Sequence, residues 1–270
     1  MLNILIKKIK LKLKYKTEYF SDLINNHWWF LTPIGIKNNK KLKALKGKYA
    51  GQRCFVLGNG PSLLKCDLTL LKDEATIVSN ANYLMWDQVG FVPNFLTVED
   101  RLVAEDRGPE INDIKNITKI FPKDLSKFLK LDEKTMYVNF LRIHNDGPRF
   151  TEDFVDKVFW GGTVTYMNLQ LAYYLGFTEI YMIGFDHNYK VTEKIVDNVI
   201  TSEADDVNHF HPDYFGKGYR WHDPRVDRMG NAYKVARKFF ESHNVKIANA
   251  TVGGKLEVFE RVDYNSLFKN

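Results

Sequence analysis

The chain has 270 residues, 44% of them hydrophobic and 14% aromatic, which is enough for one large globular α/β domain with extensions. It contains no run of 18 apolar residues and only two cysteines without a CxxC pair, which argues against a membrane span, a disulfide framework and a zinc site. The formal net charge of +6 is concentrated in residues 1–50, which carry twelve lysines and two acidic residues, so the remainder has no positive excess for binding nucleic acid.

Residues 1–47 are expected to form a basic, amphipathic extension before the folded domain. Lysine alternates with apolar residues from position 8 to position 16, as in a strand, whereas a helix would gather apolar residues on one face. The helical alternative is typical of an interfacial membrane anchor, with Trp28, Trp29 and Phe30 at the level of the lipid headgroups. The other alternative is a solvated arm that packs on its own domain or on a second subunit of a homo-oligomer.

A secretory signal is not expected, because the N-terminus has no uninterrupted apolar core and no cleavage-like end. We therefore expect a cytoplasmic protein, which residues 1–30 would hold peripherally on the inner membrane in the helical alternative and would leave free of it in the other. The basic segment from Lys37 to Lys48 is predicted to be a linker.

Residues 48–270 alternate strand-like and helix-like segments. The expected strands are Arg53–Leu57, Thr76–Ser79, Asn94–Val98, Ile117–Phe121, Met136–Phe140, Glu179–Ile183 and Lys246–Ala248. The expected helices are a short one after Pro61, then Val164–Leu175 and Val226–His243. This spacing predicts a single Rossmann-like α/β domain with a doubly wound, mostly parallel sheet. In such sheets ligands bind beyond the carboxyl ends of the strands.

The hexapeptide Gly58-Asn59-Gly60-Pro61-Ser62-Leu63 follows the first expected strand. Its two glycines allow positive φ and a close approach of backbone to ligand, and proline suits the first position of a helix. The turn is therefore predicted to aim free amides and a helix N-terminus at a phosphate. A purely structural turn is the alternative, because the pattern is neither a dinucleotide fingerprint nor a P-loop.

Polar residues also follow the next two strands. Asn80 and Asn82 come after the second strand, where an amide can bind a base or a sugar, although asparagine is equally a turn former. Glu99 and Asp100 come after the third strand and are expected to hold a metal or orient sugar hydroxyls. A simple ion pair with Arg101 is the alternative.

Two further turns carry candidate residues. Gly162, Thr163 and Thr165 open the helix at Val164, where they could bind an anion or serve only as a helix cap. Asp186 follows the strand that ends at Ile183, and it is expected either to order its loop or to contact the ligand.

Residues 187–224 form a long polar and aromatic segment that is predicted to be a lid. Four of the seven histidines lie in it, and one of His209 and His211 is the expected general base near neutral pH. A metal site from this His-x-His pair is the alternative, without an evident third ligand. The segment Trp221–Pro224 is predicted to be a turn before the last helix.

Five motifs together resemble a bacterial family related to 6-hydroxymethylpterin diphosphokinase, whose members often accompany surface-polysaccharide genes. The motifs are Phe55–Leu63 (FVLGNGPSL), Asn80, Gly161–Thr165 (GGTVT), Leu175–Tyr189 (LGFTEIYMIGFDHNY) and His209–Phe215 (HFHPDYF). The pattern is similar, more distantly, to the small bacterial lipooligosaccharide sialyltransferases. The resemblance covers roughly residues 50–250.

In those sialyltransferases a cytidine-monophosphate sugar lies across the strand ends, and a lid histidine deprotonates the acceptor hydroxyl. The resemblance implies that the turn with Asn59 contacts the nucleotide phosphate and that Asn80 contacts the nucleotide or the sugar. It also implies that Tyr189 and Tyr214 supply hydroxyls to the leaving phosphate, and that the histidine base comes from the lid.

The resemblance further places Thr163 and Thr165 near the carboxylate of the donor. The sequence departs from the sialyltransferases after the third strand, where Glu99 and Asp100 stand in place of an asparagine. It also has no evident arginine beside Gly161 for the donor carboxylate.

Three functions follow as alternatives. The first is a glycosyltransferase that moves a sugar from a nucleotide-activated donor to a bacterial surface glycan and requires no cofactor. The second is a diphosphokinase that acts on a hydroxymethyl pterin and requires Mg²⁺, with Glu99, Asp100 and Asp186 as candidate ligands. The third is a non-catalytic scaffold that binds nucleotides or glycans.

Overall fold

The computed structural model describes residues 27–142, 147–191 and 194–269, so the amphipathic pattern expected in residues 1–26 lies outside the described residues. An eight-stranded sheet forms its centre, in the order β12-β11-β8-β1-β2-β3-β4-β5, and every neighbouring pair is parallel. Its strands are β1 (Arg53–Leu57), β2 (Ala75–Ser79), β3 (Phe95–Thr97), β4 (Thr118–Pro122), β5 (Thr135–Val138), β8 (Glu179–Ile183), β11 (Lys246–Asn249) and β12 (Glu260–Arg261). The predicted Rossmann-like, doubly wound sheet is confirmed.

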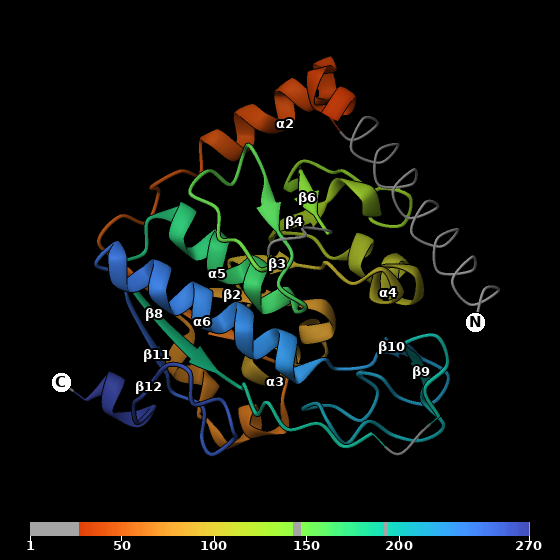
Figure 1. Ribbon diagram of the computed structural model, residues 1–270, viewed down its shortest axis with the longest axis vertical. Helices are drawn as coiled ribbons and strands as arrows, with labels where there is room; N and C mark the ends of the chain where they lie inside the picture. The colour runs from red at the N-terminus through yellow and green to blue at the C-terminus, as the bar shows by residue number, and fades with distance from the viewer. Residues whose placement is uncertain (1–26, 143–146, 192–193, 270) are drawn as a thin grey trace, which may run out of the picture.

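Helices cover both faces of the sheet (Figure 1). They are α2 (Pro33–Lys43), α3 (Trp86–Val89), α4 (Arg101–Asp113), α5 (Val164–Leu175) and α6 (Val226–Ser242), with 3-10 helices η1 (Pro61–Lys65), η2 (Leu68–Leu71), η3 (Asn80–Met85), η4 (Lys123–Leu125) and η5 (Asn265–Phe268). In β1, Cys54 and Val56 pack with residues of α2, α5 and α6, whereas Phe55 and Leu57 pack with residues of α4 and the short helices. The alternation buries both faces, as a parallel sheet requires.

The order of the strands creates a switch point between β1 and β8. From β1 the chain builds outward through β2, β3, β4 and β5, and it then returns to place β8 on the other side of β1. In open α/β sheets, ligands bind beyond the carboxyl ends of the strands at such a switch point.

Helix α2 occupies Lys37–Lys43 of the segment that was predicted to be a linker, so that prediction is wrong for these residues. Thr32 caps the helix through Gly35 N, and Pro33 occupies its first turn. The buried Asn38 side chain donates to Tyr137 O (2.8 Å) and accepts from Tyr137 N (2.7 Å), which fixes α2 on the edge strand β5. The buried side of α2 was not recognised in the sequence because exposed lysines dominate its composition.

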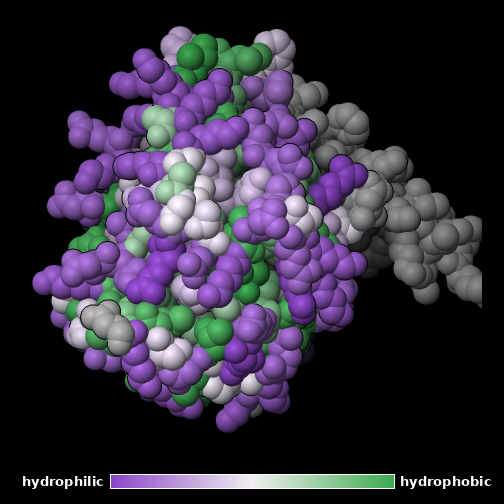
Figure 2. All heavy atoms as spheres, turned by 90° about the vertical axis from the view of Figure 1, so that its left-hand side faces the viewer, coloured by the Kyte–Doolittle hydropathy of each residue, from purple (hydrophilic) through white to green (hydrophobic). Residues whose placement is uncertain are grey.

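Of the three aromatic residues expected at lipid headgroups, two face the protein. Phe30 is buried, and the ring of Trp29 lies 5.4 Å from that of Tyr137. Trp28 is 65% exposed. Figure 2 shows hydrophobic surface at the top of the molecule, at the height where Figure 1 places the start of α2.

Two small sheets lie outside the central one. They pair β6 (Phe140–Leu141) with β7 (Val158–Phe159), and β9 (Val199–Thr201) with β10 (Arg220–His222). The second belongs to the lid, where β10 includes Trp221 and His222 of the segment predicted to be a turn, while Asp223 and Pro224 lie between β10 and α6. Within the described ranges, no helix is both long and apolar enough to cross a bilayer.

Candidate functional site

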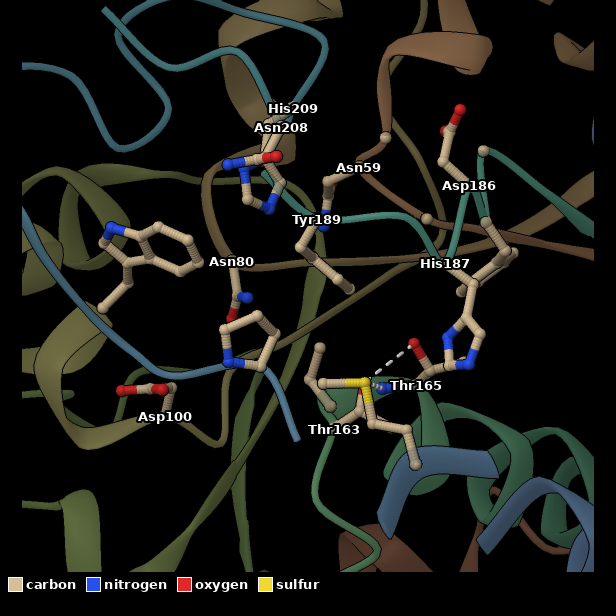
Figure 3. A pocket seen from close by; sticks show the side chains of 18 of the residues that line it. Asn59, Asn80, Asp100, Thr163, Thr165, Asp186, His187, Tyr189, Asn208 and His209 are labelled. Atoms are coloured by element: carbon tan, nitrogen blue, oxygen red, sulfur yellow. Dashed lines mark hydrogen bonds between the residues drawn. The ribbon is translucent and has the colours of Figure 1, made fainter. Parts of the chain in front are cut away.

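A pocket opens at the switch point between β1 and β8. The ends of β1, β2 and β3 supply Asn59, Asn80 and Asp100, and the start of α5 supplies Thr163, with the lid residue His209 across from it (Figure 3). The predicted residues that line the pocket are Gly58, Asn59, Gly60, Asn80, Glu99, Asp100, Gly162, Thr163, Thr165, Asp186, Tyr189, His209 and Tyr214. Three predicted residues, Ser62, Asn82 and His211, are absent from this lining.

The glycines of the first turn allow contact with the protein's own chain. A Cβ on Gly58 would lie 2.3 Å from Gly184 O, and a Cβ on Gly60 would overlap the Asp186 carboxylate. The turn adopts no positive φ at Gly60 (−71°), and the left-handed conformation occurs instead at Gly184 (77°). The expectation of positive φ at Gly60 is therefore wrong. A glycine is needed there because a side chain would collide with the loop that follows β8.

Asp186 occupies the helix N-terminus that was expected to be free for a phosphate. Its Oδ2 accepts hydrogen bonds from Ser62 N (3.2 Å) and Ser62 Oγ (2.6 Å), and Gly60 N donates to Gly184 O (2.9 Å). Figure 3 shows the carboxylate turned away from Asn80 and Thr163. The helix itself is only the five-residue η1. The prediction of free amides at Gly60 and Ser62 is wrong, because these groups are bonded within the protein.

The asparagines of the second strand end have different roles. Asn82 is buried, donates to Asn59 Oδ1 (3.2 Å) and accepts from Trp86 Nε1 (3.1 Å). It therefore lies outside the pocket lining and holds the side chain of Asn59, which is part of that lining. Asn80 lines the pocket with a left-handed φ of 57°, and its buried Oδ1 accepts no hydrogen bond within the described structure. A strained backbone and an unpaired acceptor are features that ligand binding can compensate.

Glu99 is buried between a cation and a second carboxylate. Arg142 Nη1 lies 3.2 Å from Glu99 Oε2, and Arg142 Nη2 donates to Glu99 O (2.9 Å). Burial raises the pKa of Glu99 to about 7, against the opposing effect of Arg142. Glu99 therefore changes its charge near neutral pH.

Asp100 joins a helix cap to the lid. Its Oδ1 accepts from Leu102 N (2.7 Å) at the start of α4, and its Oδ2 lies 2.8 Å from His222 Nδ1 in β10. The hydrogen bond to Asp100 raises the pKa of His222 above its ordinary value. The stability that this pair contributes is therefore present at acid pH and is lost as the pH rises through the folded-state pKa of His222.

We expect Asp100→Asn to lower the pKa of His222 while leaving α4 intact. Asparagine caps helices as well as aspartate does, but it cannot stabilise an imidazolium by its charge. A titration of the histidine ring signals by NMR, run beside a thermal melt, measures both effects. An unchanged His222 pKa would show that the pair is not formed in solution.

The start of α5 presents small residues and hydroxyl groups to the pocket. Thr163 caps the helix by accepting from Thr165 N (3.3 Å), and its hydroxyl donates to Thr165 Oγ1 (3.2 Å). Gly162 has a φ of 83° and lies against the side chain of Arg228, whose guanidinium stacks on Trp160 at 4.6 Å. This twelve-residue helix places the positive end of its dipole at the pocket.

His209 has the geometry of a general base. Its Nδ1 lies 2.7 Å from Asp206 Oδ2, and its ring stacks on Tyr214 at 4.1 Å. Burial alone would raise the pKa of Asp206, but hydrogen bonds from His209, Asn208 and Phe215 hold it below its usual range. An ionised Asp206 favours the tautomer with a proton on Nδ1, which leaves Nε2 as the acceptor.

The second predicted histidine lies outside the pocket. His211 accepts from Asp213 N through Nδ1 (3.2 Å) and does not belong to the lining. Sequence alone left His209 and His211 equivalent, and the structure separates them by the partner of each.

Ion pairs hold the lid on α4. Arg220 of β10 pairs with Glu105 (3.0 Å) and with Asp106, and Arg107 donates to Tyr214 O (3.0 Å). The lid therefore lies closed over the strand ends, with Tyr214 fully enclosed.

The three candidate magnesium ligands are engaged separately. Glu99 pairs with Arg142, Asp100 caps α4, and Asp186 binds Ser62. Among the residues that the structure describes, no group of three or more His, Cys, Asp or Glu side chains could hold a metal ion. The His-x-His alternative is also not formed, because His211 is absent from the pocket.

Sequence reasoning missed four contributors to the site. His187, His222 and Asp223 line the pocket, and Asp206 orients His209. Burial lowers the pKa of His187. The Asp206-x-x-His209 spacing was the available signal for the base, because both residues lie in one short loop.

A family model matches the chain. The model of a family described as 6-hydroxymethylpterin diphosphokinase MptE-like matches residues 34–192, which is more than half of the chain. The matched region runs from α2 through β8 and ends before His209. A search of curated proteins finds no match.

Proposed function

This chain belongs to the family described as 6-hydroxymethylpterin diphosphokinase MptE-like, and we propose that it is a glycosyltransferase. In this proposal the donor is a sugar activated by a nucleotide, with cytidine monophosphate as the carrier, and the acceptor is a hydroxyl of a bacterial surface glycan. The observation that carries the proposal is the Asp206–His209 pair on a pocket at the switch point of the sheet.

The proposed reaction is a single displacement at the anomeric carbon. His209 Nε2 takes the proton of the acceptor hydroxyl, whose oxygen bonds to that carbon while the bond to the phosphate oxygen breaks. The electron pair of that bond leaves with the phosphate. The N-terminus of α5, with Thr163 and Thr165, would stabilise the added negative charge.

Asn80 is assigned to donor recognition. Its unpaired Oδ1 can accept an N–H of the base or an O–H of the sugar, which would satisfy a buried acceptor. Its left-handed backbone fixes the direction of the amide at the end of β2. Glu99, which lines the pocket, would accept sugar hydroxyls.

Nucleotide binding is the first test. Cytidine monophosphate, CTP, ATP and UDP are added separately, with and without Mg²⁺, and the melting temperature is followed. A nucleotide at a hundred times its Kd adds about 2.7 kcal/mol to the unfolding free energy, or roughly 5 °C for a chain of this size. Cytidine monophosphate is expected to give the shift without Mg²⁺.

The variant that tests the role of Asn80 is Asn80→Gly, which removes the side-chain amide and adopts the left-handed backbone without strain. It should melt as the wild type does without nucleotide and lose most of the shift with it. A wild type that no nucleotide stabilises would refute the proposal.

A Mg²⁺-dependent diphosphokinase acting on a hydroxymethyl pterin is the second candidate. The description of the family favours it, as do the four carboxylates that line the pocket, Glu99, Asp100, Asp186 and Asp223. Mg²⁺ commonly binds through one or two carboxylates together with substrate phosphates. Stabilisation by ATP only with Mg²⁺, and turnover abolished by EDTA, would favour this candidate over the first.

A further inference from the structure

We propose that the N-terminal helical segment is a docking face for a lipid bilayer with anionic headgroups. The docking face consists of the apolar residues Trp28, Leu31, Ile34 and Ile36 and the basic residues Lys37, Lys40 and Lys43. This inference concerns the placement of the protein and is independent of the reaction that its pocket performs.

The apolar residues of the docking face are unusually exposed. Trp28, Leu31, Ile34 and Ile36 are 65%, 58%, 60% and 59% accessible, within a stretch of nine residues. Single exposed apolar residues are common, but no other nine-residue stretch of the described chain has four large ones, and this density favours contact with an apolar partner. The hydrophobic surface at the top of Figure 2 lies at this end of the molecule.

Internal contacts hold the docking face in place. Asn38 bonds both backbone groups of Tyr137, and Leu42 is fully buried with its carbonyl accepting from Tyr174 OH (3.1 Å). Phe30 is buried, and Lys123 lies 5.2 Å above the ring of Trp29. The inner side of the segment is thus saturated with contacts, and its exposed residues cannot turn inward without breaking them.

Charge selects the partner. Residues 27–50 contain six lysines and no acidic residue, and residues 1–26 add six further lysines against two acidic residues. Apolar side chains next to lysines, with a tryptophan among them, are the composition of segments that lie in the interface of anionic membranes. A protein partner of ordinary surface would require acidic groups matched to each lysine, whereas anionic headgroups supply mobile charge to all of them.

The docking face lies at a distance from the lid that covers the pocket. Figure 1 shows α2 at one end of the molecule and the lid strands β9 and β10 towards the other. Contact with a bilayer through α2 would leave the lid uncovered.

The test is flotation of the full-length protein with vesicles. One set is phosphatidylcholine alone, and the other is an equimolar mixture of phosphatidylcholine and phosphatidylglycerol, each at low and high salt. The wild type should float with the anionic vesicles at low salt. With the neutral vesicles, most of the protein should remain unbound. The triple variant Trp28→Ser, Leu31→Ser, Ile34→Ser should bind the anionic vesicles about tenfold more weakly.

The matched control replaces exposed apolar residues elsewhere, Leu64→Ser, Val92→Ser and Val252→Ser, which are 60%, 52% and 41% accessible. It should float as the wild type does. A second variant, Lys37→Gln, Lys40→Gln, Lys43→Gln, should weaken binding at low salt and remove much of its salt dependence.

Fluorescence supplies a readout that does not depend on a stable triple variant. Vesicles should shift the tryptophan emission of the wild type to the blue, and Trp28→Phe should abolish the shift while still binding. The proposal is overturned if the wild type ignores anionic vesicles, or if the triple variant floats equally well. It is also overturned if the triple variant changes only the oligomeric state, which would assign the face to a second copy of the chain.

Discussion

Replacing His209 with alanine is expected to lower kcat about a thousandfold with little change in nucleotide affinity. General bases contribute roughly 10²- to 10⁴-fold, and His209 lines the pocket with Asp206 as its aspartate partner. Release of cytidine monophosphate from a sugar donor in the presence of an acceptor measures turnover. Calorimetry with the free nucleotide measures binding.

The partner of His209 supplies a graded test. Asp206→Asn keeps a side chain of the same size but removes the charge that selects the Nδ1–H tautomer, so an intermediate loss is expected. His211→Ala, outside the pocket, and His243→Ala, at the end of α6, should retain most activity. Equal losses in His209→Ala and His211→Ala would contradict the assignment of the base.

Gly58→Ala is expected to destabilise the fold by about 3 kcal/mol, because a Cβ there would meet the backbone of Gly184 at 2.3 Å. Backbone cannot rotate away as a side chain can, so β1 and β8 must separate at the switch point. Urea unfolding followed by circular dichroism measures the change through the transition midpoint.

Gly230→Ala is the matched control, because the Cβ would have no neighbour within 4 Å and the residue lies inside α6. Alanine favours a helix over glycine by about 1 kcal/mol, so this variant should be more stable than the wild type. If Gly58→Ala were equally harmless, the contact between the two turns would not exist in solution.

The fold could be predicted well where burial leaves a strong local pattern. Expected and observed bounds agree at β1, β8 and α5, which are buried along nearly their whole length. Helix α4 was missed because it contains Gly108 and Pro109 and has few apolar residues in register. Helix α2 was missed because lysines dominate it, and its tertiary contacts come from Asn38 and Leu42.

The site could be predicted in outline because parallel strands bring their carboxyl ends together. Asn59, Asn80 and Asp100 lie at one pocket for that reason. The engagement of Ser62 by Asp186 could not be predicted, since the two are 124 positions apart in the chain. The choice between the two lid histidines depended on Asp206, whose spacing from His209 is a signal in the sequence but whose contact with the ring is formed only in the folded loop.

The bonds of Asn38 to β5 also bear on self-association. Its side-chain amide gives and takes one hydrogen bond with Tyr137, as a residue of a ninth strand would. An outermost strand with unpaired peptide groups invites the same strand of another molecule, which begins fibrous aggregation. By satisfying the backbone groups of Tyr137, Asn38 of the lysine-rich helix α2 thus protects the edge strand β5 from pairing with a strand of another molecule.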